Sequence, residues 1–346
     1  MTPLRDMMRR MNSMRILLAV SCALLLGVLC GAAQTPVAAL LVLNKEDATL
    51  AIVDPATLKV VGRVPTGEGP HEIVVSSDGR LAFASNYGAA RTPGSTISVI
   101  DLVSQKEERR VDVAPLHRPH GLAFAAGRLF FTAETDKVIG QYDPVSHEVA
   151  TVFRTGQDTT HMVLVNKDAT KIFAANISSN SITALERPPG PMNWATVRWN
   201  ETVIPVGRGP EGIDWSPDGK EIWTAHSRDG GVSIINVATK KVTQTLSLQT
   251  KRSNRLKFTL DGKRVLVSDL DANELVVLDA ASRKEIKRLA LGKTPLGILM
   301  APDRSRAFVA VNGDNYVAVV DLVSLTETGR IPTGNGPDGM AWAARR

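Results

Sequence analysis

Cysteine is nearly absent from this chain of 346 residues, and both copies, Cys22 and Cys30, lie within the first 33 residues. From Gln34 onward the sequence therefore excludes a disulfide-stapled scaffold, a cysteine-ligated zinc or iron–sulfur site and a cysteine nucleophile. It also lacks the Cys-x-x-Cys-His motif, which excludes a covalently attached c-type haem. The composition does not identify any other cofactor.

Aromatic residues are scarce as well, at 5% of the chain, and the net charge of +6 is modest. Half of that charge comes from four arginines and one aspartate in the first 33 residues. Because proteins that bind single-stranded nucleic acid need a basic groove with stacking aromatic side chains, this composition argues against a nucleic-acid partner. Dinucleotide-binding, phosphate-loop, serine-hydrolase and zinc-protease motifs are also missing from the sequence.

Only one long apolar run occurs, from Ile16 to Leu29. Arginines precede this run, and the small residues Gly31, Ala32 and Ala33 follow it, as in a secretory signal peptide. We therefore expect residues 1–33 to be a signal peptide and residues 34–346 to be a mature domain in the periplasm or outside the cell. No segment after residue 33 is apolar enough to span a membrane.

Two alternatives at the N-terminus stay open. Cys30 is a candidate for lipid acylation, although Leu29 stands where a lipoprotein signal requires a small residue. Met7, Met8 and Met11 are alternative start positions, so the first ten residues need not be translated.

The rest of the chain repeats one sequence unit. Val64–His71 (VPTGEGPH) recurs as Ile204–Glu211 (IPVGRGPE) and as Ile331–Asp338 (IPTGNGPD), with degenerate copies between them. Alternating apolar residues and short turns follow each copy, which predicts antiparallel strands. Four strands at a period of about 40–50 residues are typical of a propeller blade. We predict an all-β, seven-bladed β-propeller with four-stranded antiparallel blades over residues 34–346.

The two ends of the repeat region predict how the ring closes. The C-terminus supplies one inner strand, Gly339–Trp342, whereas the N-terminus supplies three, Leu40–Asn44, Thr49–Asp54 and Lys59–Val64. Pairing these four strands in one blade removes sheet edges that would otherwise invite aggregation. We therefore expect the N-terminal strands to pair with the C-terminal strand.

The recurring Gly-x-x-Pro, Ser-x-Asp-Gly and aromatic-or-valine-x-x-Asn pattern resembles the YVTN-type β-propeller repeat family. The resemblance covers essentially all of the chain after residue 33. It implies an exported seven-bladed propeller related to lactonase-like propellers and to propellers found near quinone-cofactor systems. The stretch His71–Gly88 is most similar to the lactonase-like branch. Since one fold hosts unrelated activities, the resemblance implies a fold and not a reaction.

One repeat position gathers histidines at the end of the channel where the inner strands begin, which we call the top. In ring order we expect the following residues at this position: His71, His120, His161, Glu211, Arg255, Leu296 and Asp338. One interpretation is a ligand site, with the three histidines as candidates for a divalent transition metal and Arg255 as an anion clamp. The other interpretation is that these side chains only hydrogen-bond the turn to the next blade.

A second set of polar residues ends the second strand of each blade. Its members are Asn44, Asn86, Glu134, Asn176, His226, Asp269 and Asn312. Asparagine suits the bend of a strand into a loop, so the departures Glu134, His226 and Asp269 are the stronger candidates for the wall of a site. His120, Glu134 and His226 are the candidates for acid or base catalysis. Asn86 and Tyr87 are further ligand-binding candidates, and we expect Tyr87–Ser95 to form a long loop, as a lid or as an ordinary surface insertion.

A proline-rich insert, Arg187–Thr202, contains Trp194 and Trp199. These rings either mark a protein contact or cover the edge of their own blade. Taken together, the sequence predicts a monomeric, exported binding or scaffold propeller for a small polar ligand or a periplasmic protein partner. The alternative is a lactonase-like or metal-assisted hydrolase or lyase that uses the top-face histidines.

Overall fold

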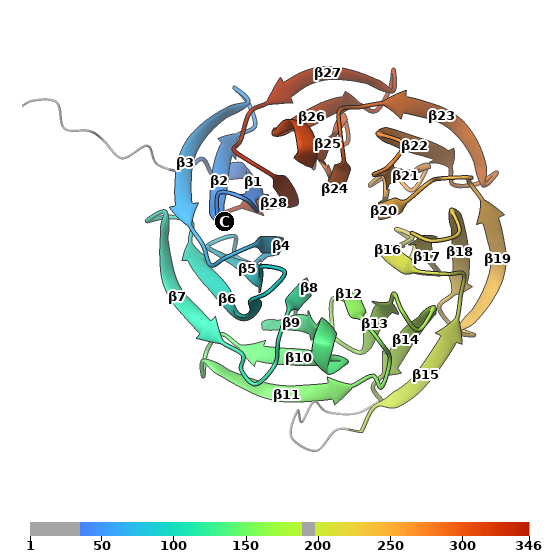
Figure 1. Cartoon of the computed structure of the whole chain (residues 1–346), viewed down its shortest axis with the longest axis horizontal. Helices are drawn as coiled ribbons and strands as arrows, with labels where there is room; N and C mark the ends of the chain where they lie inside the picture. Colours follow the sequence, from blue (N-terminus) through green and yellow to red (C-terminus); the bar gives the residue numbers. More distant parts are fainter. Residues whose placement is uncertain (1–34, 189–197, 346) are drawn as a thin grey trace, which may run out of the picture. The chain divides into compact units, whose positions relative to one another are not determined.

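The computed structural model describes residues 35–188 and 198–345. Within these ranges, 28 strands form seven four-stranded antiparallel sheets, arranged as blades around a central channel (Figure 1). The helical segments of the described chain are two short 3₁₀ turns, η1 (Glu134–Asp136) and η2 (Asn312–Asp314). No helix in the described ranges has the length and apolarity that crossing a membrane requires. The predicted seven-bladed all-β fold is confirmed, whereas the predicted signal peptide lies outside the described residues.

We number the blades along the chain and give each from its inner strand outward. Blade 1 holds β28 (Pro337–Ala344), β1 (Ala38–Asn44), β2 (Thr49–Asp54) and β3 (Lys59–Pro65), and blade 2 holds β4 (Pro70–Val75), β5 (Leu81–Gly88), β6 (Pro93–Asp101) and β7 (Lys106–Asp112). Blade 3 holds β8 (Pro119–Ala125), β9 (Arg128–Ala133), β10 (Val138–Asp143) and β11 (Glu148–Arg154), and blade 4 holds β12 (Thr160–Val165), β13 (Lys171–Asn176), β14 (Ser181–Glu186) and β15 (Asn200–Pro205). Blade 5 holds β16 (Pro210–Trp215), β17 (Glu221–His226), β18 (Gly231–Asn236) and β19 (Lys241–Ser247). Blade 6 holds β20 (Ser253–Phe258), β21 (Arg264–Asp269), β22 (Glu274–Asp279) and β23 (Lys284–Ala290), and blade 7 holds β24 (Pro295–Met300), β25 (Arg306–Val311), β26 (Tyr316–Asp321) and β27 (Thr326–Ile331).

The ring closes inside blade 1, as the two ends of the repeat region predict. The N-terminal strand β1 pairs antiparallel with the C-terminal strand β28, with Leu40 opposite Trp342 and Ala38 opposite Ala344. Residues about 300 positions apart therefore share one sheet, and blade 1 has four strands like the other six blades.

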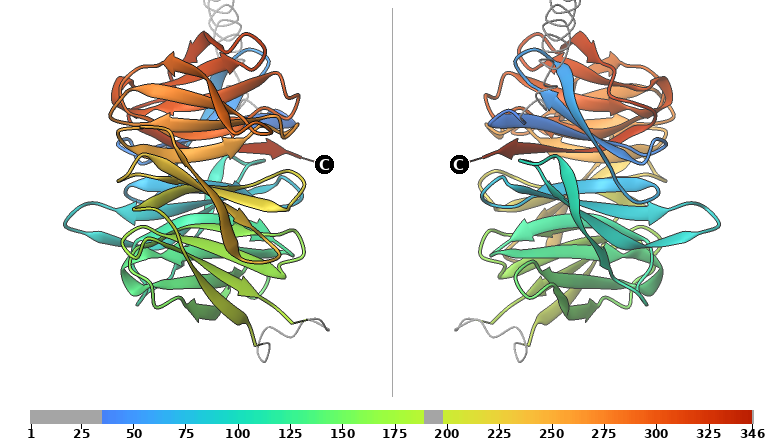
Figure 2. Two further views of the ribbon diagram at one scale, coloured as in Figure 1. Left: turned by 90° about the vertical axis from the view of Figure 1, so that its right-hand side faces the viewer. Right: turned by 90° about the vertical axis from the view of Figure 1, so that its left-hand side faces the viewer.

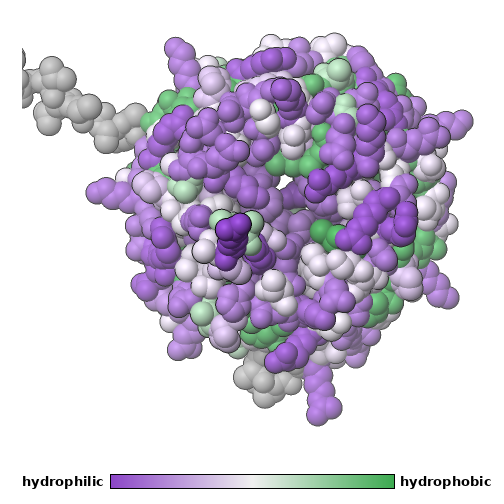
Figure 3. All heavy atoms as spheres, in the orientation of Figure 1, coloured by the Kyte–Doolittle hydropathy of each residue, from purple (hydrophilic) through white to green (hydrophobic). Residues whose placement is uncertain are grey.

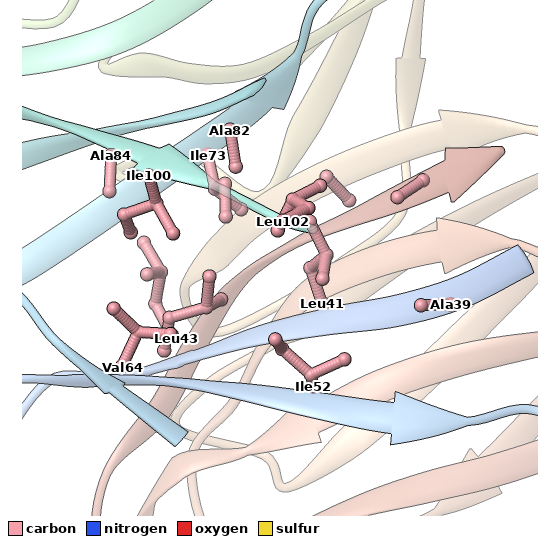
Figure 4. Close-up of a cluster of buried hydrophobic side chains, with 13 residues drawn as sticks. Ala39, Leu41, Leu43, Ile52, Val64, Ile73, Ala82, Ala84, Ile100 and Leu102 are labelled. Carbon is pink, nitrogen blue, oxygen red and sulfur yellow. The ribbon is translucent and has the colours of Figure 1, made fainter. Parts of the chain in front are cut away.

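The hydrophobic core lies between neighbouring blades. Side chains alternate between the two faces of a strand, so Leu41 of β1 points toward blade 2 while Leu40 points toward blade 7. Leu41 packs in a fully buried cluster with Ile73 of blade 2 (Figure 4), and Leu40 packs in a cluster with Phe308 of blade 7. Because both faces of each blade are covered in this way, the inner strands are held at fixed positions around the channel.

The segment Tyr87–Ser95 is shorter as a loop than the sequence suggests. Strand β5 extends to Gly88 and β6 begins at Pro93, with these two residues paired, so only four residues form the turn. The expectation of a long lid loop is wrong for this reason. The result is an extended hairpin that projects beyond the neighbouring loops on its face of the propeller (Figure 2).

The proline-rich insert links the third and fourth strands of blade 4, as expected. Trp194 lies outside the described residues. The ring of Trp199 makes an edge contact with Phe153 on the outer strand of blade 3, with centroids 5.3 Å apart. Trp199 therefore packs against the neighbouring blade and not only against the edge of its own.

Candidate functional site

Strand register shows which residues stand at the top of the channel. In five blades the first residue of the inner strand pairs with the polar residue that ends the second strand, as Pro70 pairs with Asn86 and Pro210 with His226. In blades 3 and 7 it pairs with Ala133 and Val311, one residue before Glu134 and Asn312. The next residue on each inner strand belongs to a set that we call the mouth ring. Its members, in ring order from blade 2 to blade 1, are His71, His120, His161, Glu211, Asn254, Leu296 and Asp338. Three consecutive histidines are therefore present in the mouth ring, as predicted.

The position of Arg255 corrects the sequence interpretation by one residue. In blade 6, Ser253 pairs with Asp269, so Asn254 occupies the mouth ring and Arg255 stands one residue deeper. At that depth blade 2 carries Glu72, whose carboxylate contacts the guanidinium of Arg255 across the channel. Arg255 therefore forms an ion pair with Glu72, so its guanidinium is not available to bind an anionic ligand, contrary to the sequence prediction.

Glycine at the deeper position lets neighbouring inner strands approach closely. The other blades carry Gly121, Met162, Gly212, Gly297 and Gly339 there. A Cβ atom on Gly297 would lie 2.3 Å from the carbonyl oxygen of Asp338. The channel below the mouth ring has a volume of about 420 Å³, and Glu72 and Arg255 line it.

The mouth ring is held together by side-chain contacts from blade to blade. Nδ1 of His71 lies 2.5 Å from Oδ2 of Asp338. The ring centroid of His120 lies 4.1 Å from that of His71 and 3.7 Å from that of His161. Nε2 of His161 in turn lies 4.0 Å from a carboxylate oxygen of Glu211. The three imidazoles therefore form one row, with a carboxylate at each end.

Glu134 completes the site from behind this row. It lies in η1, directly after β9, and its two carboxylate oxygens contact Nδ1 of His161 and the hydroxyl of Tyr87. Burial acts to raise the pKa of Glu134, but the hydrogen bonds from His161 and Tyr87 outweigh it, so the pKa is lowered. Burial and the Glu134 charge raise the pKa of Tyr87. Tyr87 therefore donates its proton to an ionised Glu134.

His120 is the least satisfied side chain of the site. It is 1% exposed, and in the described part of the chain neither ring nitrogen has a hydrogen-bond partner. Burial, the adjacent imidazoles of His161 and His71, and then the positive charges of Arg255 and Lys45 hold the pKa of His120 well below its usual value. The imidazole is therefore neutral, with one nitrogen lone pair available to a ligand.

Two cations flank the mouth ring on the side of blade 2. Nζ of Lys45 lies 3.8 Å from Asp338 and 5.7 Å from the centre of the Tyr87 ring. The guanidinium of Arg118 lies 4.7 Å from the same ring centre and donates to the carbonyl oxygens of Ala89 and Ala90. Arg118 thereby ties down the turn of the β5–β6 hairpin. Burial acts to raise the pKa of Asp338, but His71, Lys45 and Arg255 outweigh it and lower the pKa.

Two predicted ligand-binding residues are engaged within their own blades. Oδ1 of Asn86 accepts a hydrogen bond of 3.1 Å from the amide of Gly67, and its Nδ2 donates to Ser98. The carboxylate of Asp269 accepts hydrogen bonds from the amides of Lys251 and Arg252, at 2.8 and 2.9 Å. Both side chains therefore stabilise a loop of their own blade by accepting hydrogen bonds from its backbone amides, a structural role and not a ligand-binding one.

His226 occupies the same position in blade 5. Its Nδ1 lies 2.9 Å from Oδ1 of Asp229, and its ring packs directly beneath Gly207. Burial lowers the pKa of His226 although Asp229 acts in the opposite direction. Its Nε2 has no hydrogen-bond partner among the described residues. His226 is therefore buried in the wall of blade 5, in contact with its own loop.

Sequence analysis missed three participants: Asp338 as the partner of His71, Lys45 above Tyr87, and Glu72 opposite Arg255. The signal for Asp338 was present, because it follows Gly-Pro in the repeat as His71 does. The other two give no sequence signal, since their roles depend on distances between blades. Figure 3 shows the surface over this region, where a hollow at the centre of the ring is surrounded mainly by hydrophilic residues.

The protein family that this sequence matches is also described as a β-propeller. A family model described as a YncE-like β-propeller matches residues 1–200. The Salmonella typhimurium protein YncE, described as uncharacterized, is 23% identical over 153 residues, a stretch that covers only 43% of either chain.

Many solved structures are similar to most of this chain, and two of them illustrate the likeness. They are the periplasmic gluconolactonase PpgL of Pseudomonas aeruginosa (TM-score 0.70, 17% identity, 89% of this chain and 99% of that chain) and the hydrazine synthase of Kuenenia stuttgartiensis (TM-score 0.65, 20% identity, 78% of this chain and 88% of that chain). At these identities the likeness shows the fold alone, and the finer YVTN-type assignment remains a prediction. Because the matching family model covers more than half of the chain, this protein belongs to the YncE-like β-propeller family.

Proposed function

We propose that the chain binds a small, uncharged polar molecule, such as a polyol or a lactone, at the mouth ring. The charges around the ring support an uncharged ligand because several of them already have partners. Asp338 contacts His71 and Lys45, Glu72 contacts Arg255, and Glu134 is hydrogen-bonded on both oxygens. A ligand with a net charge would have to compete with one of these pairs.

This proposal rests on buried histidine nitrogens of the mouth ring that have no hydrogen-bond partner among the residues that the structure describes. In the described chain, both nitrogens of His120 and Nε2 of His161 lack hydrogen-bond partners. Leaving a buried polar atom unpaired costs about 1–3 kcal/mol, and native proteins rarely tolerate several such atoms together. A ligand that offers donors and acceptors at this level would recover that free energy.

The test is a binding screen by thermal unfolding and calorimetry with matched sugars, polyols, lactones and sugar acids. We expect at least one uncharged compound to raise the melting temperature. His71→Ala should weaken its binding at least tenfold, because His71 is the most exposed histidine of the mouth ring. The matched control is His147→Ala on an exposed turn of blade 3. Binding of sugar acids only, or equal binding by wild type and His71→Ala, would contradict the proposal.

A second candidate function is hydrolysis of a lactone. The specific observation is the pair of His71 with Asp338, a buried carboxylate 2.5 Å from Nδ1. A carboxylate at Nδ1 orients the imidazole so that Nε2 can accept a proton from water. The hydroxide then adds to the lactone carbonyl, the ring C–O bond breaks, and the proton passes to the leaving alkoxide. The fold likeness to a gluconolactonase agrees with this candidate but does not establish it.

Lactone hydrolysis is measured by acid release from gluconolactone, with the uncatalysed rate subtracted. Asp338→Asn should lower kcat by at least tenfold while leaving ligand binding nearly intact, because the amide still fits but no longer stabilises the protonated imidazole. If the wild type releases acid no faster than buffer, the chain is a binding protein and the hydrolase is rejected.

We further propose that the protein acts in the periplasm or outside the cell, on the strength of the expected signal peptide. Mass spectrometry of protein expressed with its own N-terminus should find a chain that begins at Gln34. An uncleaved chain in the cytoplasm, or a chain that begins with lipidated Cys30, would overturn this proposal.

A further inference from the structure

We infer that His120, His161 and Glu134 form a binding site for one divalent d-block metal ion of the Zn²⁺ class. The inference deepens the proposed ligand site, on which it rests for its biological meaning. Among the described residues, one potential ligand atom from each of these three side chains lies within 4.8 Å of the other two. The three residues come from two adjacent blades, 3 and 4, and all are buried.

The spacing of the three ligand atoms suits an ion. Zn²⁺ lies about 2.0–2.2 Å from histidine nitrogen and carboxylate oxygen, so two of its ligands are separated by at most about 4.4 Å. A set of atoms within 4.8 Å of one another therefore needs only rotation of side chains to close around an ion. The β8 and β12 strands that carry the two histidines are fixed by the interblade core, so the backbone need not move.

The chemistry of the ligand atoms selects the class of metal. Two imidazole nitrogens and one carboxylate oxygen favour Zn²⁺, Co²⁺, Ni²⁺ or Fe²⁺ over Ca²⁺ and Mg²⁺, which prefer oxygen ligands throughout. His120 presents two nitrogens without partners, and a metal bond would satisfy one of them. Three protein ligands leave a fourth position open for water or for the polar ligand, as in catalytic rather than structural zinc sites.

Neighbouring groups support the ligands as they do in known metal sites. Tyr87 donates its hydroxyl proton to Glu134, which leaves the other carboxylate oxygen, now at His161, for the ion. Arg118 holds Tyr87 in place through its ring. Such outer contacts orient metal ligands and are nearly as important as the ligands themselves.

Glu134 is unlike the aspartates that end the third strands, although Asp338, Asp229 and Asp136 also contact one histidine each. The aspartates that end the third strands are engaged in turns, as Asp54 accepts from Ala56 and Asp101 accepts from Ser104. Those turn hydrogen bonds lower the pKa values of Asp54 and Asp101, and among the described residues neither carboxylate contacts a histidine. The cluster of His120, His161 and Glu134 therefore differs from the repeat in both composition and contacts.

The experiment uses the full-length protein without a polyhistidine tag, stripped with a chelator and titrated with Zn²⁺ by calorimetry and with Co²⁺ by visible absorption. We expect one ion per chain and the ligand-field bands of Co²⁺ with mixed nitrogen and oxygen ligands. His120→Ala and His161→Ala should each weaken Zn²⁺ binding at least 100-fold. Glu134→Gln should weaken it at least tenfold, because the amide keeps the shape but lacks the charge.

Controls separate loss of a ligand from loss of the fold. His226→Asn changes a buried histidine outside the cluster, and His147→Ala changes an exposed one; both should bind Zn²⁺ as the wild type does. Circular dichroism checks folding, and Glu134→Gln decides the outcome if the histidine variants do not fold. Less than half an ion per chain, or unchanged binding by Glu134→Gln, would overturn the inference.

The outcome for the metal is independent of the outcome for the ligand. Binding of an uncharged polar compound to chelator-treated protein, with no Zn²⁺ uptake, would reject the metal site and keep the proposed function. One Zn²⁺ per chain with no bound compound from the screen would reject the proposed function and keep the metal site. Titration with Ca²⁺ and Mg²⁺ tests the assigned class, because binding of either ion in preference to Zn²⁺ would contradict it.

Discussion

The guanidinium of Arg255 in blade 6 contacts the carboxylate of Glu72 in blade 2, across the channel and directly below the mouth ring. Both side chains are largely buried, at 5% and 15% exposure. Burial acts to lower the pKa of Arg255, but the carboxylates of Glu72, Asp338 and Glu211 outweigh it and raise the pKa. The pair therefore couples opposite sides of the ring and supports the residues above it.

Breaking this pair should destabilise the propeller. Glu72→Gln leaves a buried arginine without its principal counter-charge, a change that typically costs about 3–5 kcal/mol. Because Asn254 still accepts a hydrogen bond from Arg255, we expect the lower end of this range. Urea unfolding measures the loss. Glu327→Gln, which breaks an ion pair with the exposed Arg330, is the control and should cost much less, because solvent screens an exposed pair. Equal losses would mean that the channel pair contributes no more than a surface pair.

Shortening Leu41 should weaken the contact between blades 1 and 2. Leu41 is fully buried against Ile73 and Leu102, and its truncation to alanine leaves a cavity that the rigid strands cannot close (Figure 4). The expected loss in the free energy of unfolding is about 2–5 kcal/mol. Val103→Ala, at a position about half exposed, is the control and should change it by less than about 0.5 kcal/mol. A small effect of Leu41→Ala would show that the blades can repack around the gap.

The fold was readable from the sequence because the repeat carries its own landmarks. In the clear copies of the repeat, Gly-Pro stands where each inner strand begins, and alternating apolar residues mark the strands. The three strands at the start of the repeat region and the one at its end together make up a four-stranded blade. These are local features, and a seven-fold repetition of local features fixes the architecture. Two of the three mouth-ring histidines follow from the same landmark, since His71 and His120 directly follow a proline, whereas His161 follows Thr160.

The contacts within the site were not readable from the sequence. Blade 6 lacks the proline, so the sequence pattern predicts Arg255 in the mouth ring, whereas the strand register puts Asn254 there. The contact of Glu134 with His161 depends on the lateral spacing of two blades, which no strand pattern contains. The sequence predicts a loop at Tyr87, whereas in the structure the strand pairing continues beyond Asn86. The hairpin bulges between Asn86 and Gly88, where Gly88 has a positive φ of 81°, and then continues.

Replacing His226 should change how stability depends on pH. Burial lowers the pKa of His226 in the folded chain below the usual 6.5, despite Asp229. As the pH falls through 6.5 the unfolded chain binds a proton first, so the free energy of unfolding of the wild type decreases until the folded pKa is reached. In His226→Asn, which carries the residue found in blades 1, 2 and 4, this part of the decrease should be absent.

The measurement is urea unfolding of both proteins between pH 7.5 and pH 5. The difference in the free energy of unfolding, wild type minus variant, should decline as the pH falls. His147→Asn, at an exposed turn of blade 3, is the control variant. Parallel pH profiles for wild type and His226→Asn would show that this histidine titrates in the folded chain as it does in the unfolded chain.

Removing one hydroxyl group from Tyr87 should loosen the metal site without touching a metal ligand. Tyr87→Phe keeps the ring between Lys45 and Arg118 but takes away the donor that orients Glu134. Loss of such an outer contact typically weakens metal binding about 10–100-fold. Zinc titration should therefore give a larger dissociation constant with the same stoichiometry of one ion per chain. Tyr142→Phe removes a hydroxyl that lies 3.2 Å from Nδ1 of His147, away from the metal cluster, and should leave zinc affinity unchanged. If both variants bind zinc equally well, Tyr87 does not position Glu134, and the orientation of that carboxylate must come from His161 alone.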